Sequence, residues 1–138
     1  GSDELSSGDV GAWPDLAMVG GELLIAYQDI GNGDLRLARG STSSSWTVKV
    51  VDNGTEVGAD ARLFVDGGSP GMYYFDGYNN DLKLAVEDAD SETGWRTETL
   101  AGEEAALGFH IDTVTDGSKR YVACYDFTNR KIWFDRAE

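Results

Sequence analysis

The sequence predicts an all-β fold built from a repeated sheet of short antiparallel strands. Three observations predict it. One pattern of apolar residues and glycines occurs three times, and 18 glycines against two prolines indicate many tight turns. No segment keeps a helical apolar period over the ten or more residues that a helix needs. With 138 residues, 41% of them hydrophobic, the chain is long enough to bury a core.

Three sets of equivalent residues keep the three copies in register. A glycine opens each copy, an aspartate ends the second predicted strand, and an asparagine follows that aspartate three residues later. The sets are Gly11, Gly58 and Gly108; Asp29, Asp76 and Asp126; and Asn32, Asn79 and Asn129. Trp46 and Trp95 form a further pair. A period of about 50 residues is typical of propeller blades and similar repeat architectures.

Each copy divides into four predicted strands, whose boundaries are clearest in the first copy. Gly20-Gly21 separates the first strand from the second, and Asn32-Gly33 is a strong hairpin signal between the second and the third. Leu35 and Leu37 alternate with charged neighbours, as in a half-buried strand. The predicted strands cover residues 15–19, 23–29, 34–39 and 46–51. Four antiparallel strands per period are typical of a β-propeller blade.

The domain organisation predicted from the repeat is a single partial β-propeller over residues 3–138, with Gly1-Ser2 read as a cloning scar. The blades are expected at about 11–52, 58–101 and 108–138, so the third lacks a tryptophan-led fourth strand. Propellers have four to eight blades, and open sheet edges promote association. We expect a homodimer of about six blades, in which Asp3-Glu4-Leu5-Ser6 supplies the missing outer strand. The alternative is a piece of a larger propeller that a different chain completes.

These repeats resemble the blades of bacterial β-propellers of the broad sialidase-like kind. The matching stretches are residues 11–17, 25–38 and 46–52, which include Ile25-Ala26-Tyr27-Gln28-Asp29 and Asn32-Gly33-Asp34-Leu35. The resemblance implies the fold and a secreted or cell-surface bacterial protein. It does not imply sialidase activity, because the Asp-box pattern S-x-D-x-G-x-T-W is absent.

Charge and composition narrow the classes of partner and site. The net charge of −14, from 25 acidic and 11 basic residues, disfavours nucleic acid as a partner because phosphate backbones would be repelled. No apolar stretch approaches the 18 residues of a membrane-spanning helix. The single Cys124 allows no internal disulfide, and its apolar strand predicts a buried, inert thiol. One histidine and one cysteine also disfavour a structural zinc site.

The repeated Asp-x-x-Asn motif has two interpretations. The stretch Asp29-Ile30-Gly31-Asn32-Gly33-Asp34 offers several oxygen atoms of the kind that calcium prefers. In the third copy, however, Asn129-Arg130-Lys131 places a cation where the last carboxylate would be. Aspartate and asparagine also stabilise turns by bonding to their own backbone. We therefore expect a turn and no cofactor, with calcium as the alternative.

Candidate site residues are found where the copies differ most. Two equivalent positions near the start of each copy carry unlike side chains, and the first strand of a blade borders the central channel of a propeller. The two sets are Trp13, Asp60 and His110, and Asp15, Arg62 and Asp112. Together they would line a polar ligand pocket. The alternative is that they are solvated channel residues or ion-pair partners.

The function predicted from these features is a non-catalytic ligand- or partner-binding module, with a glycan as one candidate ligand that Trp13 could stack against. One alternative is a propeller fragment whose property is self-assembly into a closed ring. The other is a glycosidase-like enzyme that uses the channel carboxylates Asp15, Asp60 and Asp112, because glycoside hydrolysis needs two carboxylates at a defined separation.

Overall fold

The computed structural model describes residues 8–43 and 45–137, and this part of the chain forms three antiparallel sheets without a helix. The first sheet contains β1 (Val10–Val19), β2 (Glu22–Asp29), β3 (Asp34–Gly40) and β4 (Thr47–Asp52). The second contains β5 (Val57–Asp66), β6 (Ser69–Asp76), β7 (Asp81–Glu87) and β8 (Trp95–Ala101). The third contains β9 (Phe109–Asp116), β10 (Lys119–Asp126) and β11 (Lys131–Ala137). The predicted all-β class is therefore confirmed.

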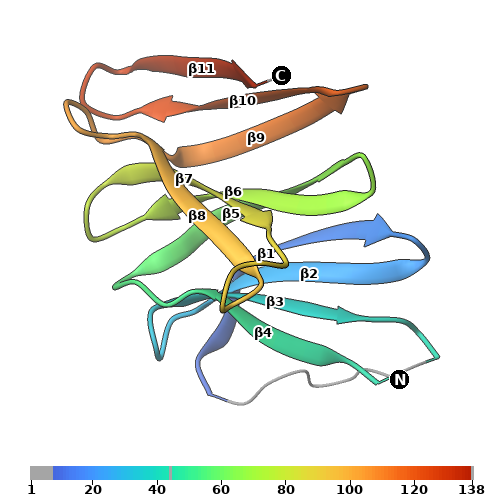
Figure 1. Ribbon diagram of the computed structural model, residues 1–138. Coiled ribbons are helices and arrows are strands. Elements are labelled where there is room, and N and C mark those ends of the chain that lie inside the picture. The colour runs from blue at the N-terminus through green and yellow to red at the C-terminus, as the bar shows by residue number, and fades with distance from the viewer. Residues whose placement is uncertain (1–7, 44, 138) are drawn as a thin grey trace.

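Strands follow one another in each sheet in the order of the sequence, so each sheet is a simple meander. Figure 1 shows the three sheets stacked, with the second sheet between the first and the third. The first strands of the sheets lie beside one another, since β5 contacts both β1 and β9. The expected pairing of Asp3-Glu4-Leu5-Ser6 lies outside the described residues. The described part of the chain contains no helix long and apolar enough to cross a membrane.

Two apolar clusters hold the stack together, one on each side of the second sheet. Neighbouring residues of β6 point to opposite faces, as the strand period of two requires: Met72 and Tyr74 pack toward the first sheet, and Tyr73 packs toward the third. Cys124 lies in the second cluster at 3% exposure, and burial raises the pKa of its thiol. The predicted burial of the cysteine is thus confirmed, and a raised thiol pKa disfavours the reactive thiolate.

The first strand of each sheet is longer than the sequence predicts, because a bulge lets it continue past a residue with a left-handed backbone. β1 begins at Val10 rather than at residue 15. The pairing register shifts at the equivalent place in β1, β5 and β9, and Trp13, Asp60 and His110 each have a φ of 54° there. Residues other than glycine avoid this region at a cost of about 1–2 kcal/mol, so a strand with such an interruption is hard to foresee.

The equivalent glycines are explained by the close approach of neighbouring sheets. Gly58 has a φ of 102°, and a Cβ there would lie 2.9 Å from the Cα of Leu35 in β3. Gly108, at 101°, would in the same way lie 3.3 Å from the Cα of Leu82 in β7. Gly11 has a similar φ of 91°, but a Cβ there would have no neighbour within 4 Å. Within the described residues, the first sheet therefore has nothing packed at this position.

Candidate functional site

Aspartates of the first strands join neighbouring sheets through main-chain hydrogen bonds. The backbone N–H of Leu63 in β5 donates to Oδ2 of Asp15 in β1 over 2.7 Å. The backbone N–H of His110 in β9 donates to Oδ2 of Asp60 in β5. Hydrogen bonds to a charged acceptor contribute about 1.5–3 kcal/mol. Two of the three candidate carboxylates thus hold adjacent sheets together.

Arg62 takes the ion-pair role that the sequence offered as the alternative to a ligand site. Its Nη2 lies 3.1 Å from Oδ1 of Asp60, and its Nη1 donates to the carbonyl oxygen of Ala61 over 2.8 Å. The structure therefore brings Asp60, Arg62 and the backbone of His110 together. Trp13 is 54% exposed on β1; whether it binds a ligand stays a prediction.

His110 and Asp112 share a shallow hollow on the outward face of the third sheet. Asp112 is exposed, and its Oδ1 accepts a hydrogen bond from the backbone N–H of Thr113 over 2.9 Å. The hollow measures about 260 Å³ and is lined by His110, Asp112, Ala123, Cys124, Tyr125 and Ile132. The other four candidate residues, Trp13, Asp15, Asp60 and Arg62, are not part of its lining.

The Asp-x-x-Asn motif closes a tight turn at all three places, which confirms the turn interpretation. In the first turn both the backbone N–H and the side-chain amide of Asn32 donate to the carboxylate of Asp29, over 3.0 and 2.8 Å. The same pair of bonds occurs in the other two turns. The hydrogen bond from the Asn32 side chain is the largest cause that lowers the pKa of Asp29, and the nearby Arg36 lowers it further.

Within residues 8–43 and 45–137, no group of three or more histidine, cysteine, aspartate or glutamate side chains is placed to hold a metal ion. The oxygens of Asp29 and Asp126 serve the asparagines of their own turns. Asp29 also has Nη2 of Arg36 at 2.8 Å. These contacts stabilise the turns.

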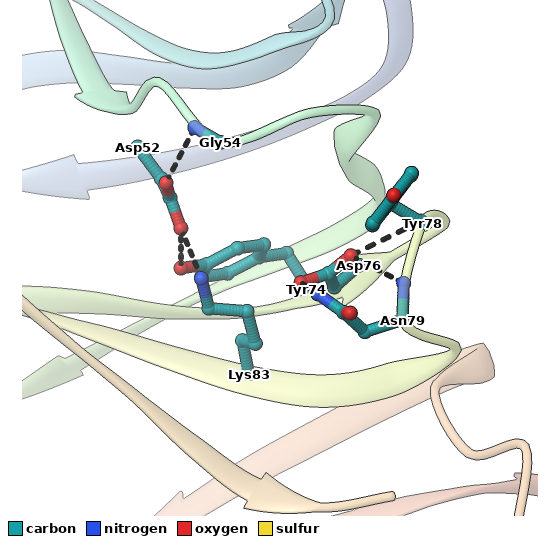
Figure 2. Close-up of polar contacts among 7 residues, drawn as sticks. All are labelled: Asp52, Gly54, Tyr74, Asp76, Tyr78, Asn79 and Lys83. Atoms are coloured by element: carbon teal, nitrogen blue, oxygen red, sulfur yellow. Dashed lines mark hydrogen bonds and ion pairs between the residues drawn. The ribbon is translucent and has the colours of Figure 1, made fainter.

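A second polar network, shown in Figure 2, connects the end of β4 in the first sheet to β6 and β7 in the second. The hydroxyl of the fully buried Tyr74 donates to Oδ2 of Asp52 over 2.6 Å. The ammonium group of Lys83 lies 2.6 Å from the same oxygen. Burial alone would raise the pKa of Asp52, but the hydrogen bonds from Lys83 and Tyr74 outweigh burial and lower it. Sequence analysis found no signal for this network, because Asp52 belongs to the first repeat whereas Tyr74 and Lys83 belong to the second.

The outward faces of the first and third sheets carry exposed apolar side chains. On β1, Leu16 and Met18 are 63% and 64% exposed. On the third sheet, Val114, Ile132 and Phe134 are 62%, 78% and 62% exposed. We call these two surfaces the β1 face and the β11 face. Contiguous exposed apolar patches usually mark interaction sites, and sequence analysis overlooked both.

Equivalent residues of the other sheets are buried. In the third strands, Ile132 corresponds to Leu35 and Leu82, both of which are 0% exposed. Phe134 corresponds to Leu37 and Leu84, which are 4% and 5% exposed. The β11 face therefore has the composition of a sheet-to-sheet interface but has no sheet packed on it among the described residues. Period-two alternation of Ile132 and Phe134 in the sequence is the signal that could have revealed it.

Comparisons with known proteins give no basis for assigning a function to this chain. No family model, no curated protein and no solved structure matches it. The interactions described above, and above all the unlike apolar faces at the two ends of the stack, are therefore the basis for inferring what the protein does.

Proposed function

We propose that this chain is a non-catalytic partner-binding module, a set of β-propeller blades whose two end faces bind further blades, and that a second copy of the chain is the partner they fit. The observation that carries the proposal is that both junctions between sheets share a main-chain hydrogen bond and a close glycine contact at equivalent residues, and that each end face presents one half of each. A carboxylate that accepts a backbone N–H also joins both junctions, at Asp15 in the first and at the non-equivalent Asp60 in the second.

A main-chain hydrogen bond is the first repeated part. The N–H of Val57 donates to the carbonyl oxygen of Gly33 over 3.0 Å, and the N–H of Leu107 donates to that of Asn80 over 3.0 Å. At the ends of the stack the corresponding residues are Val10 on the first sheet and Arg130 on the third. Docking the β1 face of one copy on the β11 face of another would place these two residues opposite each other.

Close packing of a glycine on a leucine is the second part. Gly58 approaches Leu35, and Gly108 approaches Leu82. The corresponding pair at the ends is Gly11, which has open space beside it, and the 78% exposed Ile132. The side chain of Ile132 in one copy would fill the space beside Gly11 of the other and remove apolar surface from water, at about 25 cal/mol per Å².

A carboxylate that accepts a backbone N–H from the next sheet is the third part. Asp15 accepts from Leu63 of the next sheet. The equivalent of Asp15 in the third sheet is Asp112, and the equivalent of Leu63 in the first sheet is Leu16. In the proposed dimer, Asp112 of one copy would therefore accept a hydrogen bond from the backbone N–H of Leu16 in the other. The third sheet supplies the acceptor and the first sheet supplies the donor.

Charge favours a second copy over an unrelated surface. Residues 8–52 carry six acidic and three basic side chains, whereas residues 109–137 carry four acidic and five basic ones. The third sheet is thus mildly basic in a chain with a net charge of −14, and it would dock on the acidic first sheet. Such an interface joins the β1 face of one copy to the β11 face of the other. Two copies related by a two-fold axis would form this interface twice and close a ring of six blades, and propellers usually have four to eight blades.

The glycosidase alternative has weaker support. Glycoside hydrolysis needs two carboxyl groups facing one substrate, whereas Asp15 and Asp60 accept main-chain hydrogen bonds from neighbouring strands. Asp60 also pairs with Arg62. A secreted or cell-surface location is part of this proposal, because the sequence resembles bacterial β-propellers of that kind.

Light scattering after size exclusion, at loading concentrations from 5 to 200 μM chosen for the assay, tests the proposal. The wild-type chain should be a dimer. Ile132→Asp should shift it to a monomer, since a carboxylate would then be buried beside Gly11. Tyr78→Asp, which alters a 67% exposed side chain on a loop of the middle sheet, is the matched control and should remain dimeric.

Circular dichroism of both variants checks that the strands are retained. A wild-type monomer at the highest concentration would refute the second copy as partner and would leave blades of another chain as the occupant. An Ile132→Asp variant that stays dimeric would show that association uses a different surface, and would equally contradict the proposal.

A further inference from the structure

A groove between the first and second sheets, lined by none of the candidate residues of the first strands, has the chemistry of a small-ligand site. Two adjoining hollows of about 270 and 350 Å³ share Lys49, Glu87 and Gly94. The remaining lining residues are Leu37, Arg39, Thr47, Ser69, Ala89 and Trp95. Ligand pockets typically measure about 300–1,000 Å³, and the two adjoining hollows together fall within this range, which suits a ligand the size of a single sugar ring.

Opposite charges line the groove, and one cation in it has no acidic partner. Arg39 of β3 uses its Nη2 to bind Oε1 of Glu87 at the end of β7, over 2.9 Å. Lys49 of β4 faces both hollows, and among the described residues no carboxylate lies within 4.0 Å of its ammonium group. In a chain with 25 acidic and 11 basic residues, an unpaired lysine in a concave site is a candidate for binding an anionic group.

Hydroxyl and apolar groups complete the lining. Thr47 already donates its hydroxyl hydrogen to the carbonyl oxygen of Arg39 over 3.3 Å, so its hydroxyl oxygen is available as an acceptor, and Ser69 offers a second hydroxyl. The free acceptor capacity of Glu87 can take hydroxyl donors from a ligand. Leu37 and the buried Trp95 form an apolar wall that suits the C–H face of a sugar ring.

We propose that this groove binds a small hydroxylated carboxylate, a hexuronic acid such as glucuronate or galacturonate, free or as a unit of an acidic glycan. The ligand carboxylate would lie against Lys49, and ring hydroxyls would donate to Glu87. A phosphate dianion fits less well, because Glu87 would repel it and occupies one end of the Arg39 guanidinium. The site lies within one chain, so it does not depend on the proposed ring.

Titration of the ¹⁵N-labelled protein with glucuronate and with galacturonate, followed by NMR, tests this site. At least one of them should cause saturable shifts of the Gly94, Trp95 and Thr47 amide signals. Glucose, which lacks the carboxylate, and acetate, which lacks the ring, should each bind at least tenfold more weakly than that uronate. Lys49→Met should weaken its binding at least tenfold, whereas Lys119→Met, at an exposed lysine of β10, should leave it unchanged.

Three results would refute the proposal. The first is that neither uronate produces saturable shifts at these amides. The second is that Lys49→Met binds as tightly as the wild type, and the third is that acetate binds as tightly as the uronate. The last result would reduce the site to a simple anion site. Because the titration reports on amides between the first two sheets, its outcome is separate from the dimer test, which reports on the two end faces.

Discussion

Removing the hydroxyl of Tyr74 tests the network that joins the first sheet to the second. Tyr74→Phe keeps the buried ring and deletes only the 2.6 Å hydrogen bond to Asp52. Such bonds to a charged acceptor contribute about 1.5–3 kcal/mol. Because Asp52 keeps Lys83 and the backbone N–H of Gly54 as donors, no charge is left unpaired. We therefore expect a loss of about 2 kcal/mol in the free energy of unfolding.

Urea denaturation followed by tryptophan fluorescence measures this loss at pH 7. Protein concentration must be equal for all variants, since association would make the apparent stability depend on it. Tyr78→Phe, at a 67% exposed tyrosine, is the matched control and should change the free energy by less than about 0.5 kcal/mol. If the two variants unfold at the same urea concentration with the same slope, the Tyr74–Asp52 bond does not stabilise the fold and the reasoning is wrong.

Two further predictions concern acid stability and the repeated glycines. The free energy of unfolding should fall as the pH is lowered from about 5 toward 2, because hydrogen bonds in the folded state lower the pKa of Asp29, Asp52 and Asp126 below their ordinary value of 3.8. The unfolded chain then takes up protons first. Denaturation curves at several pH values measure this, and constant or rising stability over that range would contradict it. The glycine comparison uses Ile132→Asp as its background, because that variant is designed to be monomeric. In this background, Gly58→Ala should lower the free energy of unfolding by about 1–3 kcal/mol more than Gly11→Ala does. Both positions have positive φ, but only Gly58 has a neighbouring Cα at 2.9 Å; equal thermal midpoints would rule out this close packing.

Much of the fold could be predicted from the sequence, because strand alternation and turn residues are local signals. Asn32 and its equivalents identify the hairpins, and the structure places turns at all three. The start of β1 could not be predicted. Its bulge places Trp13 at a φ of 54°, and a tryptophan does not signal a left-handed residue as a glycine would.

The candidate site was predictable only in part, because function there depends on contacts between repeats. Sequence comparison identified Asp15, Asp60 and Arg62 at two positions where the copies differ, but it could not show that the two carboxylates bind backbone groups of the next sheet. The two end faces were missed for another reason. Ile132 aligns with leucines that are buried, so the repeat pattern marks it as a core position and not as an exposed one.

Each sheet has one face of the β1 kind and one of the β11 kind, and this asymmetry affects how such a protein can lengthen. Each copy of about 50 residues brings one surface of each kind, so a gene duplication that adds a copy consumes one exposed surface and supplies an identical replacement. The stack can therefore gain or lose units without the invention of a new type of contact. In the proposed ring, the tilt between neighbouring sheets would then set the number of units needed for closure.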